Sequence, residues 1–131
     1  MTNREGRAAD EAFIFSTWLR GLRFGNDWFE LIESDSYYKA YHRVIEMILK
    51  DPGTVITVAC LKDDAVVILG YSVANSLGGL HWVHVKSAWR GIGIANSLKP
   101  QAVDYVTHLT NTGRSILKKH PKVIFNPFRL P

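Results

Sequence analysis

The chain contains a single cysteine, Cys60, among its 131 residues. One cysteine excludes an internal disulfide and a zinc site built from several cysteines, and it favours a reducing, cytoplasmic setting. Because Cys60 lies in the apolar run TVITVACL, we expect its thiol to be a small buried group. No apolar run reaches the roughly 18 residues of a membrane helix, and the first residues carry acids where a signal peptide is basic. We therefore expect no membrane partner.

Acidic residues are scarce in the second half of the chain. Residues 65–131 contain eight Lys and Arg but only Asp104 as an acid, which gives a net charge of +7. Residues 1–64 contain eight Lys and Arg and eleven acids, which gives −3 and leaves the whole chain at +4. A basic half of this kind attracts phosphates. The alternative is a solvated basic face without a partner.

The apolar pattern predicts a mixed order of helices and strands. Helical spacing indicates helices over residues 10–23 and 35–49, and three apolar runs joined by short turns indicate strands over 55–61, 66–73 and 80–85. The rest reads as a helix from 94 to about 103 that Pro100 interrupts, then strand 105–110, helix 112–119 and strand 122–128.

These elements predict an α/β fold with a mixed, mostly antiparallel central sheet and helices on both faces. At 131 residues we expect one domain over 1–131, with residues 1–9 as a flexible tail.

The stretch HVKSAWRGIGIANSL, residues 84–98, places two glycines and a basic residue between a strand and a helix. Glycine lets a ligand approach the backbone, and the start of a helix exposes N–H groups without partners. The stretch therefore predicts an anion site at Arg90, Gly91 and Gly93. The alternative is a tight turn in which the glycines only permit left-handed dihedral angles.

This stretch, in this order of elements, resembles the cofactor motif of the GCN5-related N-acetyltransferases, the GNAT family. The resemblance implies binding of acetyl-CoA as cosubstrate and an amine as acceptor. It implies that backbone amides hold the pyrophosphate, and those residues are Arg90, Gly91, Ile92, Gly93, Ile94 and Ala95. It also implies that the main chain of Val83 and Val85 pairs with the pantetheine arm.

Candidate catalytic residues follow from the same resemblance. Alternation along a strand puts His81 on one face and His84 on the other, which argues against a shared metal. Some family members carry a histidine at the position of His81, and we predict it as the general base; the alternative is a histidine packed in the sheet. Asn111 matches a cofactor-binding Asn or else caps a helix, and Lys118 stands where the family's acid Tyr is expected. We predict that Tyr105, or water, protonates the thiolate instead.

The remaining hypotheses concern partners and function. The family's first and last strands are expected to be missing, and exposed sheet edges then predict a homodimer. Aromatic residues line the acceptor pocket or belong to the core: Trp18, Phe24, Trp28 and Phe29. The leading function is an acetyl-CoA-dependent N-acyltransferase. The alternatives are a nucleic-acid-binding or DNA-modifying protein that uses Lys118, Lys119, Lys122 and Arg129, and a CoA-binding pseudoenzyme.

Overall fold

The structure is a computed structural model that describes residues 1–131. Its elements, apart from three short 3-10 turns, are β1 (Thr2–Glu5), α1 (Glu11–Phe24), α2 (Ser34–Lys50), β2 (Thr54–Leu61), β3 (Asp64–Asn75), β4 (Gly79–Val85), α3 (Ile94–Leu98), β5 (Tyr105–Val106), α4 (Asn111–Leu117) and β6 (Ile124–Phe125).

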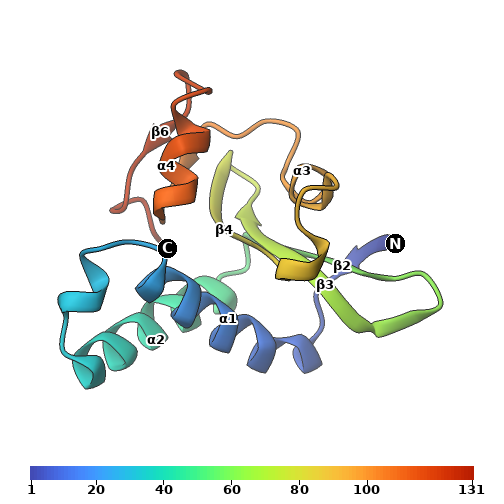
Figure 1. Cartoon of the computed structure of the whole chain (residues 1–131), viewed down its shortest axis with the longest axis horizontal. Coiled ribbons are helices and arrows are strands. Elements are labelled where there is room, and N and C mark those ends of the chain that lie inside the picture. Colours follow the sequence, from blue (N-terminus) through green and yellow to red (C-terminus); the bar gives the residue numbers. More distant parts are fainter.

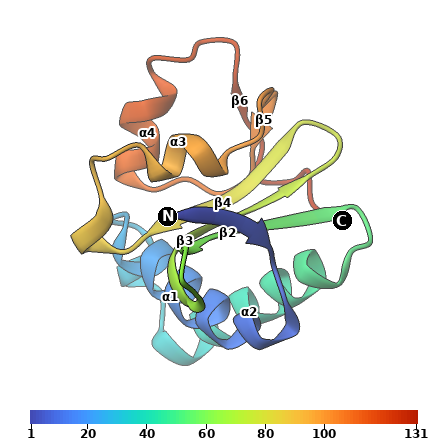
Figure 2. The same cartoon turned by 90° about the vertical axis from the view of Figure 1, so that its right-hand side faces the viewer.

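The six strands form one sheet in which spatial order equals chain order. Strands β1 to β4 pair antiparallel, whereas β5 lies parallel to β4 and β6 lies parallel to β5. Helices α1 and α2 cover one face, and α3 and α4 lie on the other side (Figures 1 and 2). The predicted mixed α/β class with helices on both faces is confirmed.

The first residues differ from the expectation of a flexible tail. Strand β1 pairs antiparallel with β2, and Thr2 lies opposite Cys60. Polar contacts of Arg4 attach this strand to the rest of the fold. The Arg4 guanidinium donates to both carboxylate oxygens of Asp10 at 2.8 and 2.9 Å, and the Nε of Arg4 donates to the carbonyl of Ala65. The strand expected to be missing is therefore present, and this edge no longer motivates the predicted dimer.

The main core lies between the sheet and helices α1 and α2. Trp18 of α1 is fully buried and stacks on Trp82 of β4 with ring centroids 5.8 Å apart. Buried hydroxyls in this core are bonded, since Tyr37 donates to the carbonyl of Leu19 at 2.6 Å and Tyr71 donates to the carbonyl of Ile14 at 3.1 Å. Cys60 is buried, as expected.

The opposite face has a smaller core because α3 is only five residues long. The helix ends at Leu98, two residues before Pro100, where the residue before a proline avoids helical geometry. A second cluster packs there from Ala59, Leu69, Val85, Ile94 and Leu98.

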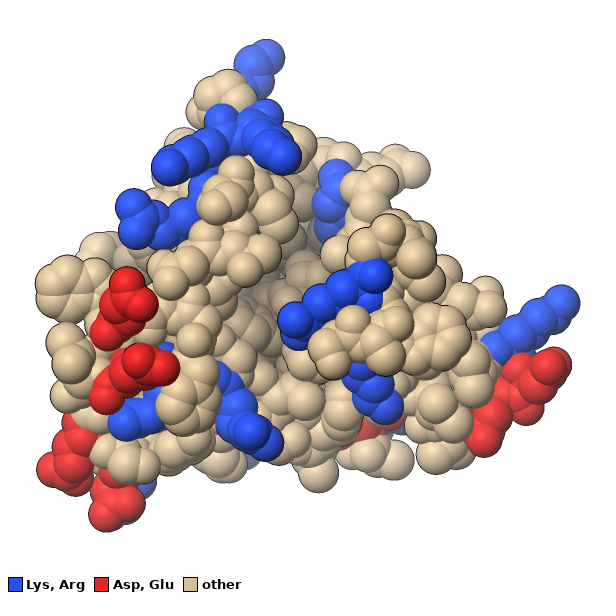
Figure 3. Space-filling model, viewed as in Figure 1, with Lys and Arg blue, Asp and Glu red and all other residues tan.

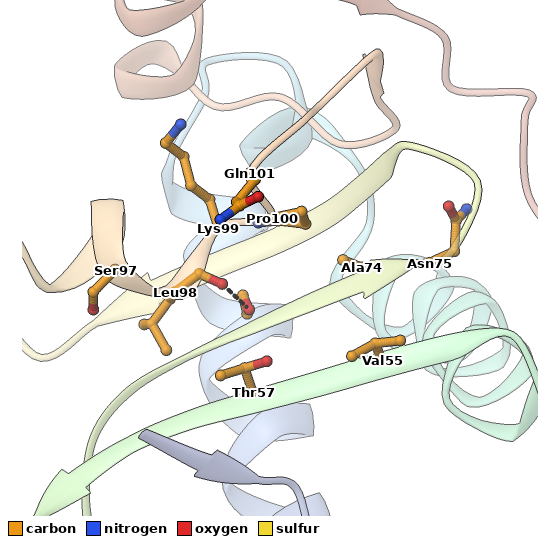
Figure 4. A pocket seen from close by; sticks show the side chains of 10 residues that line it. Val55, Thr57, Ala74, Asn75, Ser97, Leu98, Lys99, Pro100 and Gln101 are labelled. Atoms are coloured by element: carbon orange, nitrogen blue, oxygen red, sulfur yellow. Dashed lines mark hydrogen bonds between the residues drawn. The ribbon is translucent and has the colours of Figure 1, made fainter. Parts of the chain in front are cut away.

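Beside this cluster, segment 97–101 and strands β2 and β3 leave a pocket of about 370 Å³ (Figure 4). The carbonyl of Leu98 accepts a hydrogen bond from Ser72 at 2.8 Å and fixes the segment on the sheet.

Strands β5 and β6 are much shorter than the predicted ranges 105–110 and 122–128. Each has two paired residues, and the chain leaves the sheet after Val106 and Phe125. None of the helices is both long and apolar enough to cross a membrane.

Candidate functional site

Strands β4 and β5 separate part-way along their length. Gly79 and Leu80 pair with Tyr105 and Val106, and the amide of Thr107 donates to the carbonyl of Leu80 at 3.3 Å. No residue of β5 pairs with β4 beyond this point. The second half of β4, residues 81–85, therefore has an open edge.

The open edge presents the backbone groups that the resemblance assigned to the pantetheine arm. The amide of Lys86 donates to the carbonyl of Leu69 at 2.8 Å, so Val85 and its partner Gly70 form a pair whose own backbone groups point away from each other. Alternation gives Val83 the same orientation. Val83 and Val85 thus direct their N–H and C=O groups toward the open edge, and the surface is hollowed between α4 and α3 (Figure 3).

The glycine turn follows this edge directly. Gly91 and Gly93 have φ angles of 81° and 89°, in the left-handed region that favours glycine. The amides of Gly91, Ile92 and Gly93 donate no hydrogen bond within the protein. A Cβ at either glycine would meet no atom within 4 Å, so neither glycine is required by packing. The turn offers free backbone donors in open space.

Arg90 links the turn to the strand. Its Nε donates to the carbonyl of Val85 at 2.8 Å. Ile94 and Ala95 form the first turn of α3, where amides have no acceptor inside a helix. The structure therefore brings together the open edge and the glycine turn, as the resemblance implied.

His81 lies where the two strands separate, and a bulge alters its position. Val73 pairs with Trp82 while Ala74 pairs with Leu80, so His81 is an extra residue in β4. The alternation predicted for residues 82–85 holds, because Trp82 packs against α1 and Val85 packs against α3. His81 instead bonds through Nδ1 to the hydroxyl of Thr107 at 2.7 Å.

The two histidines of β4 have different surroundings. His81 is 1% exposed, and its Nε2 has no hydrogen-bond partner. Burial lowers the pKa of His81, and the charge of Asp51 opposes this. His84 lies against the rings of Phe13 and Tyr71, and burial lowers its pKa first, followed by the charges of Arg90 and Lys86. No three metal-binding side chains converge anywhere in the molecule.

Tyr105 lies at the other end of β4 from the open edge. It pairs with Gly79, is 3% exposed, and its hydroxyl accepts a hydrogen bond from Asn75 at 2.7 Å. The guanidinium of Arg129 covers its ring at 4.1 Å. The structure thus keeps Tyr105 apart from Val83 and Val85.

Asn111 begins α4, but it is not the capping residue. The hydroxyl of Thr110 accepts from the amide of Gly113 at 3.1 Å, and this corrects the expectation of a cap at Asn111. The backbone amide of Asn111 donates to the carbonyl of Gly25, and its side chain is exposed. Lys118 follows the last residue of the same helix and is also exposed.

The aromatic residues of the first helical region divide into two groups. Trp18 belongs to the core, and Phe29 packs against it. Phe24 and Trp28 are 59% and 79% exposed. The core interpretation therefore fits the first pair, and only the second pair is free to meet a ligand.

Comparisons with known proteins bear on this arrangement. No family model and no curated protein matches the sequence. Among solved structures, an acetyltransferase from Vibrio fischeri is 16% identical with a TM-score of 0.52, and the match covers 95% of this chain and 93% of that one. A ribosomal-protein-alanine N-acetyltransferase from Brucella melitensis biovar Abortus 2308 is 15% identical with a TM-score of 0.55, and it covers 91% and 89%.

This chain has the GNAT fold. The predicted resemblance is confirmed at the level of fold. At identities of 15% and 16% the likeness concerns the fold alone. A proposal about activity therefore has to be argued from the residues of this chain.

Sequence reasoning missed two residues of this site, Thr107 and His108. The hydroxyl of Thr107 also lies 2.9 Å from Nδ1 of His108, whose ring packs edge-on against Trp18 with centroids 5.2 Å apart. Burial, followed by the charge of His81, lowers the pKa of His108 to about 4. The only sequence signal was the pair of polar residues in the middle of a predicted strand.

Proposed function

We propose that this chain is an acetyl-CoA-dependent N-acyltransferase that moves an acetyl group to a primary amine. The observation that carries the proposal is the open edge of β4, which leads directly into a turn with three unbonded amides. Both solved structures compared above are described as acetyltransferases, which supports the same class of reaction.

The free backbone donors fit the shape and charge of the cosubstrate. The amides of Gly91 to Gly93 and the first turn of α3 would bind the pyrophosphate, which needs many N–H donors and close approach to the backbone. Val83, through its N–H and C=O groups, and Val85, through its N–H group, would pair with the amide groups of the pantetheine arm as a strand does, while the carbonyl of Val85 accepts from Arg90. Asn111, exposed at the start of α4, is proposed as a further contact to the cosubstrate.

His81 is proposed as the general base. A base for an amine has to be neutral before the reaction, and the lowered pKa of His81 keeps its imidazole neutral at pH 7. Its Nε2 has no partner in the protein and can accept a proton; because Nε2 is buried, the proton has to reach it through a water or after the site opens around the acceptor. For the departing thiolate, we favour water over Tyr105, because the Tyr105 hydroxyl accepts a hydrogen bond from Asn75 at the paired end of β4, away from Val83 and Val85.

A binding experiment tests the cosubstrate site. Acetyl-CoA is titrated into the wild type and Gly93→Trp by calorimetry, and thermal unfolding is followed in parallel. We expect the wild type to bind, and the indole in open space above the turn to lower the affinity by about 100-fold, or about 3 kcal/mol. Leu77→Trp, at a residue 73% exposed in the turn between β3 and β4, is the matched control and should bind as the wild type does.

The outcomes separate the competing functions. Absence of binding to the wild type, or equal binding by Gly93→Trp, would reject the site. Binding without release of free CoA in the presence of an amine panel would identify the pseudoenzyme instead. With turnover, His81→Gln should lower the rate by about 100-fold, since a positioned base contributes at least that much.

A second candidate function rests on the charges of α4 and the segment after it. Arg114, Lys118, Lys119 and Lys122 are exposed, and none forms an ion pair. Basic side chains gather over this part of the molecule (Figure 3). Binding to nucleic acid predicts retention on a DNA column at low salt that disappears as salt is raised, and no retention would remove this candidate.

A further inference from the structure

The side chains of His81, Thr107 and His108 form one hydrogen-bonded chain at the point where β4 and β5 separate. The pairing of the two strands ends at Leu80 and Val106, so His81 and Thr107 are the first residues beyond it on either side. Their side chains continue the contact at 2.7 Å, and the same hydroxyl reaches Nδ1 of His108 at 2.9 Å.

We propose that Thr107 and His108 are positioning residues that keep Nε2 of His81 free of hydrogen and carry away the proton that Nε2 accepts. This proposal rests on the acyltransferase activity proposed above.

A single hydroxyl between two imidazoles restricts their tautomers. The Thr107 hydroxyl has one hydrogen and no hydrogen-bond partner other than the two rings, so it donates to one ring and accepts from the other. When both rings are neutral, one histidine therefore carries its hydrogen on Nδ1 and the other carries it on Nε2. The arrangement has two states, and one proton shift along the chain converts one into the other.

Burial selects between these states. Nε2 of His81 is buried without a partner, and an N–H there would be an unbonded donor in the core. His108 is partly exposed, and neither of its ring nitrogens is among the buried polar atoms without a partner, so an Nε2–H there carries no such penalty. The favoured state therefore has hydrogen on Nδ1 of His81 and on Nε2 of His108, and it leaves a lone pair on Nε2 of His81.

No carboxylate competes for the hydrogens of the chain, and the backbone of His81 is the one further hydrogen-bonding group beside His108, where it opposes the lowering of the His108 pKa by burial. His81 feels the charge of Asp51 at the end of α2, and His108 contacts the rings of Trp18 and Tyr41 from α1 and α2. Neither ring forms a hydrogen bond or ion pair with a carboxylate. The only polar partner that both rings share is the Thr107 hydroxyl.

The acyl transfer moves one proton from the amine to the thiolate. The amine nitrogen forms a bond to the thioester carbonyl carbon, the carbon–sulfur bond breaks, and sulfur leaves with the electron pair. The amine proton passes to Nε2 of His81. The Nδ1 hydrogen of His81 moves to Thr107, the Thr107 hydrogen moves to Nδ1 of His108, and Nε2 of His108 releases its hydrogen to water. Water protonates the thiolate. To restore the first state, a proton from water enters at Nε2 of His108, the shift runs in reverse, and Nε2 of His81 gives its proton to water in the emptied site.

Nitrogen-15 NMR of the histidine rings tests the chain without any substrate. In the wild type near pH 7 we expect His81 protonated on Nδ1 and His108 protonated on Nε2. Thr107→Val removes the hydroxyl and should give mixed tautomers at both rings, whereas Thr107→Ser should keep the wild-type pattern. The same tautomer at both rings, or an unchanged pattern in Thr107→Val, would overturn the proposal.

Turnover then tests the proton transfer. Thr107→Val and His108→Gln should each lower the rate of CoA release by about 10-fold or more and change its pH profile, while Thr107→Ser should restore the rate. His120→Gln, at an exposed histidine outside the chain, is the control and should leave the rate unchanged. If Thr107→Val releases CoA at the wild-type rate, the proposed proton transfer through Thr107 is wrong and the proposed function still stands. No CoA release by the wild type overturns the proposed function and the proton transfer with it.

Discussion

The segment up to the end of β4 and the segment after it are built differently. Strands β2, β3 and β4 have 8, 12 and 7 residues, and two long helices cover one face of them. After Val85 the strands have two residues each, and the helices have five and seven. All eight Lys and Arg of the basic half also lie after Val85. Burial of apolar surface stabilises the first segment, whereas the second keeps its backbone and charges available to ligands.

The largest effect should come from the core of the first segment. Trp18→Ala removes a fully buried indole from between α1 and β4, and we expect a loss of about 4 kcal/mol in the free energy of unfolding. Leu98→Ala, in the smaller cluster under α3, should cost about 2 kcal/mol. Urea unfolding of both variants measures the difference. Equal losses would show that apolar burial stabilises the two segments to the same extent.

The next largest effect concerns acid and the contact between the two segments. The pKa of His108 is about 4 in the folded protein and about 6.5 when unfolded, so the unfolded chain binds more protons between these values. The contribution of His108 to the free energy of unfolding is therefore fully present above pH 6.5 and decreases as the pH falls toward 4. The loss from His108 amounts to at most about 3 kcal/mol, and the lowered pKa of His81 acts in the same direction.

Urea unfolding at pH 7.5 and at pH 4.5 measures this loss. His108→Gln should show a smaller decrease between the two pH values than the wild type. His120→Gln, which removes an exposed histidine, should behave as the wild type does. An identical decrease in all three proteins would place the acid sensitivity elsewhere.

The sequence predicted the elements of the first segment well because their apolar patterns are long. It missed β1, since the residues TNRE have no apolar alternation and the strand is held by pairing with β2 and by the Arg4–Asp10 contact. That contact joins residues of opposite charge six positions apart, and nothing local distinguishes it from two solvated side chains.

In the candidate site, too, some features were predictable from the sequence and others were not. The glycine turn was predictable because φ angles of 81° and 89° leave a direct trace in the sequence as Gly91 and Gly93. The direction of the His81 ring was not, because the bulge at His81 depends on the register of β3 against β4. The contact between Thr107 and His108 was not predictable either, because β5 ends at Val106 and the polar residues that follow do not show that the strand stops there.

The smallest effect should come from the end of the second segment. The Arg129 guanidinium lies 4.1 Å from the centre of the buried Tyr105 ring, and it is the only cation–π contact between the last ten residues and the sheet. Arg129→Ala should cost about 1 kcal/mol in the free energy of unfolding, because an exposed cation over an aromatic ring contributes little more than that. Lys122→Ala removes the same charge from an exposed side chain without such a contact and should cost close to nothing.

The pair of variants distinguishes contact from charge. Each variant lowers the net charge by one, so any effect of reduced repulsion within the basic segment appears in both. A loss in Arg129→Ala alone identifies the ring contact as an anchor of the chain end. A loss of 2 kcal/mol or more would be too large for that contact. It would mean that the last residues are part of the stable segment, and the boundary at Val85 would no longer describe how stability is distributed.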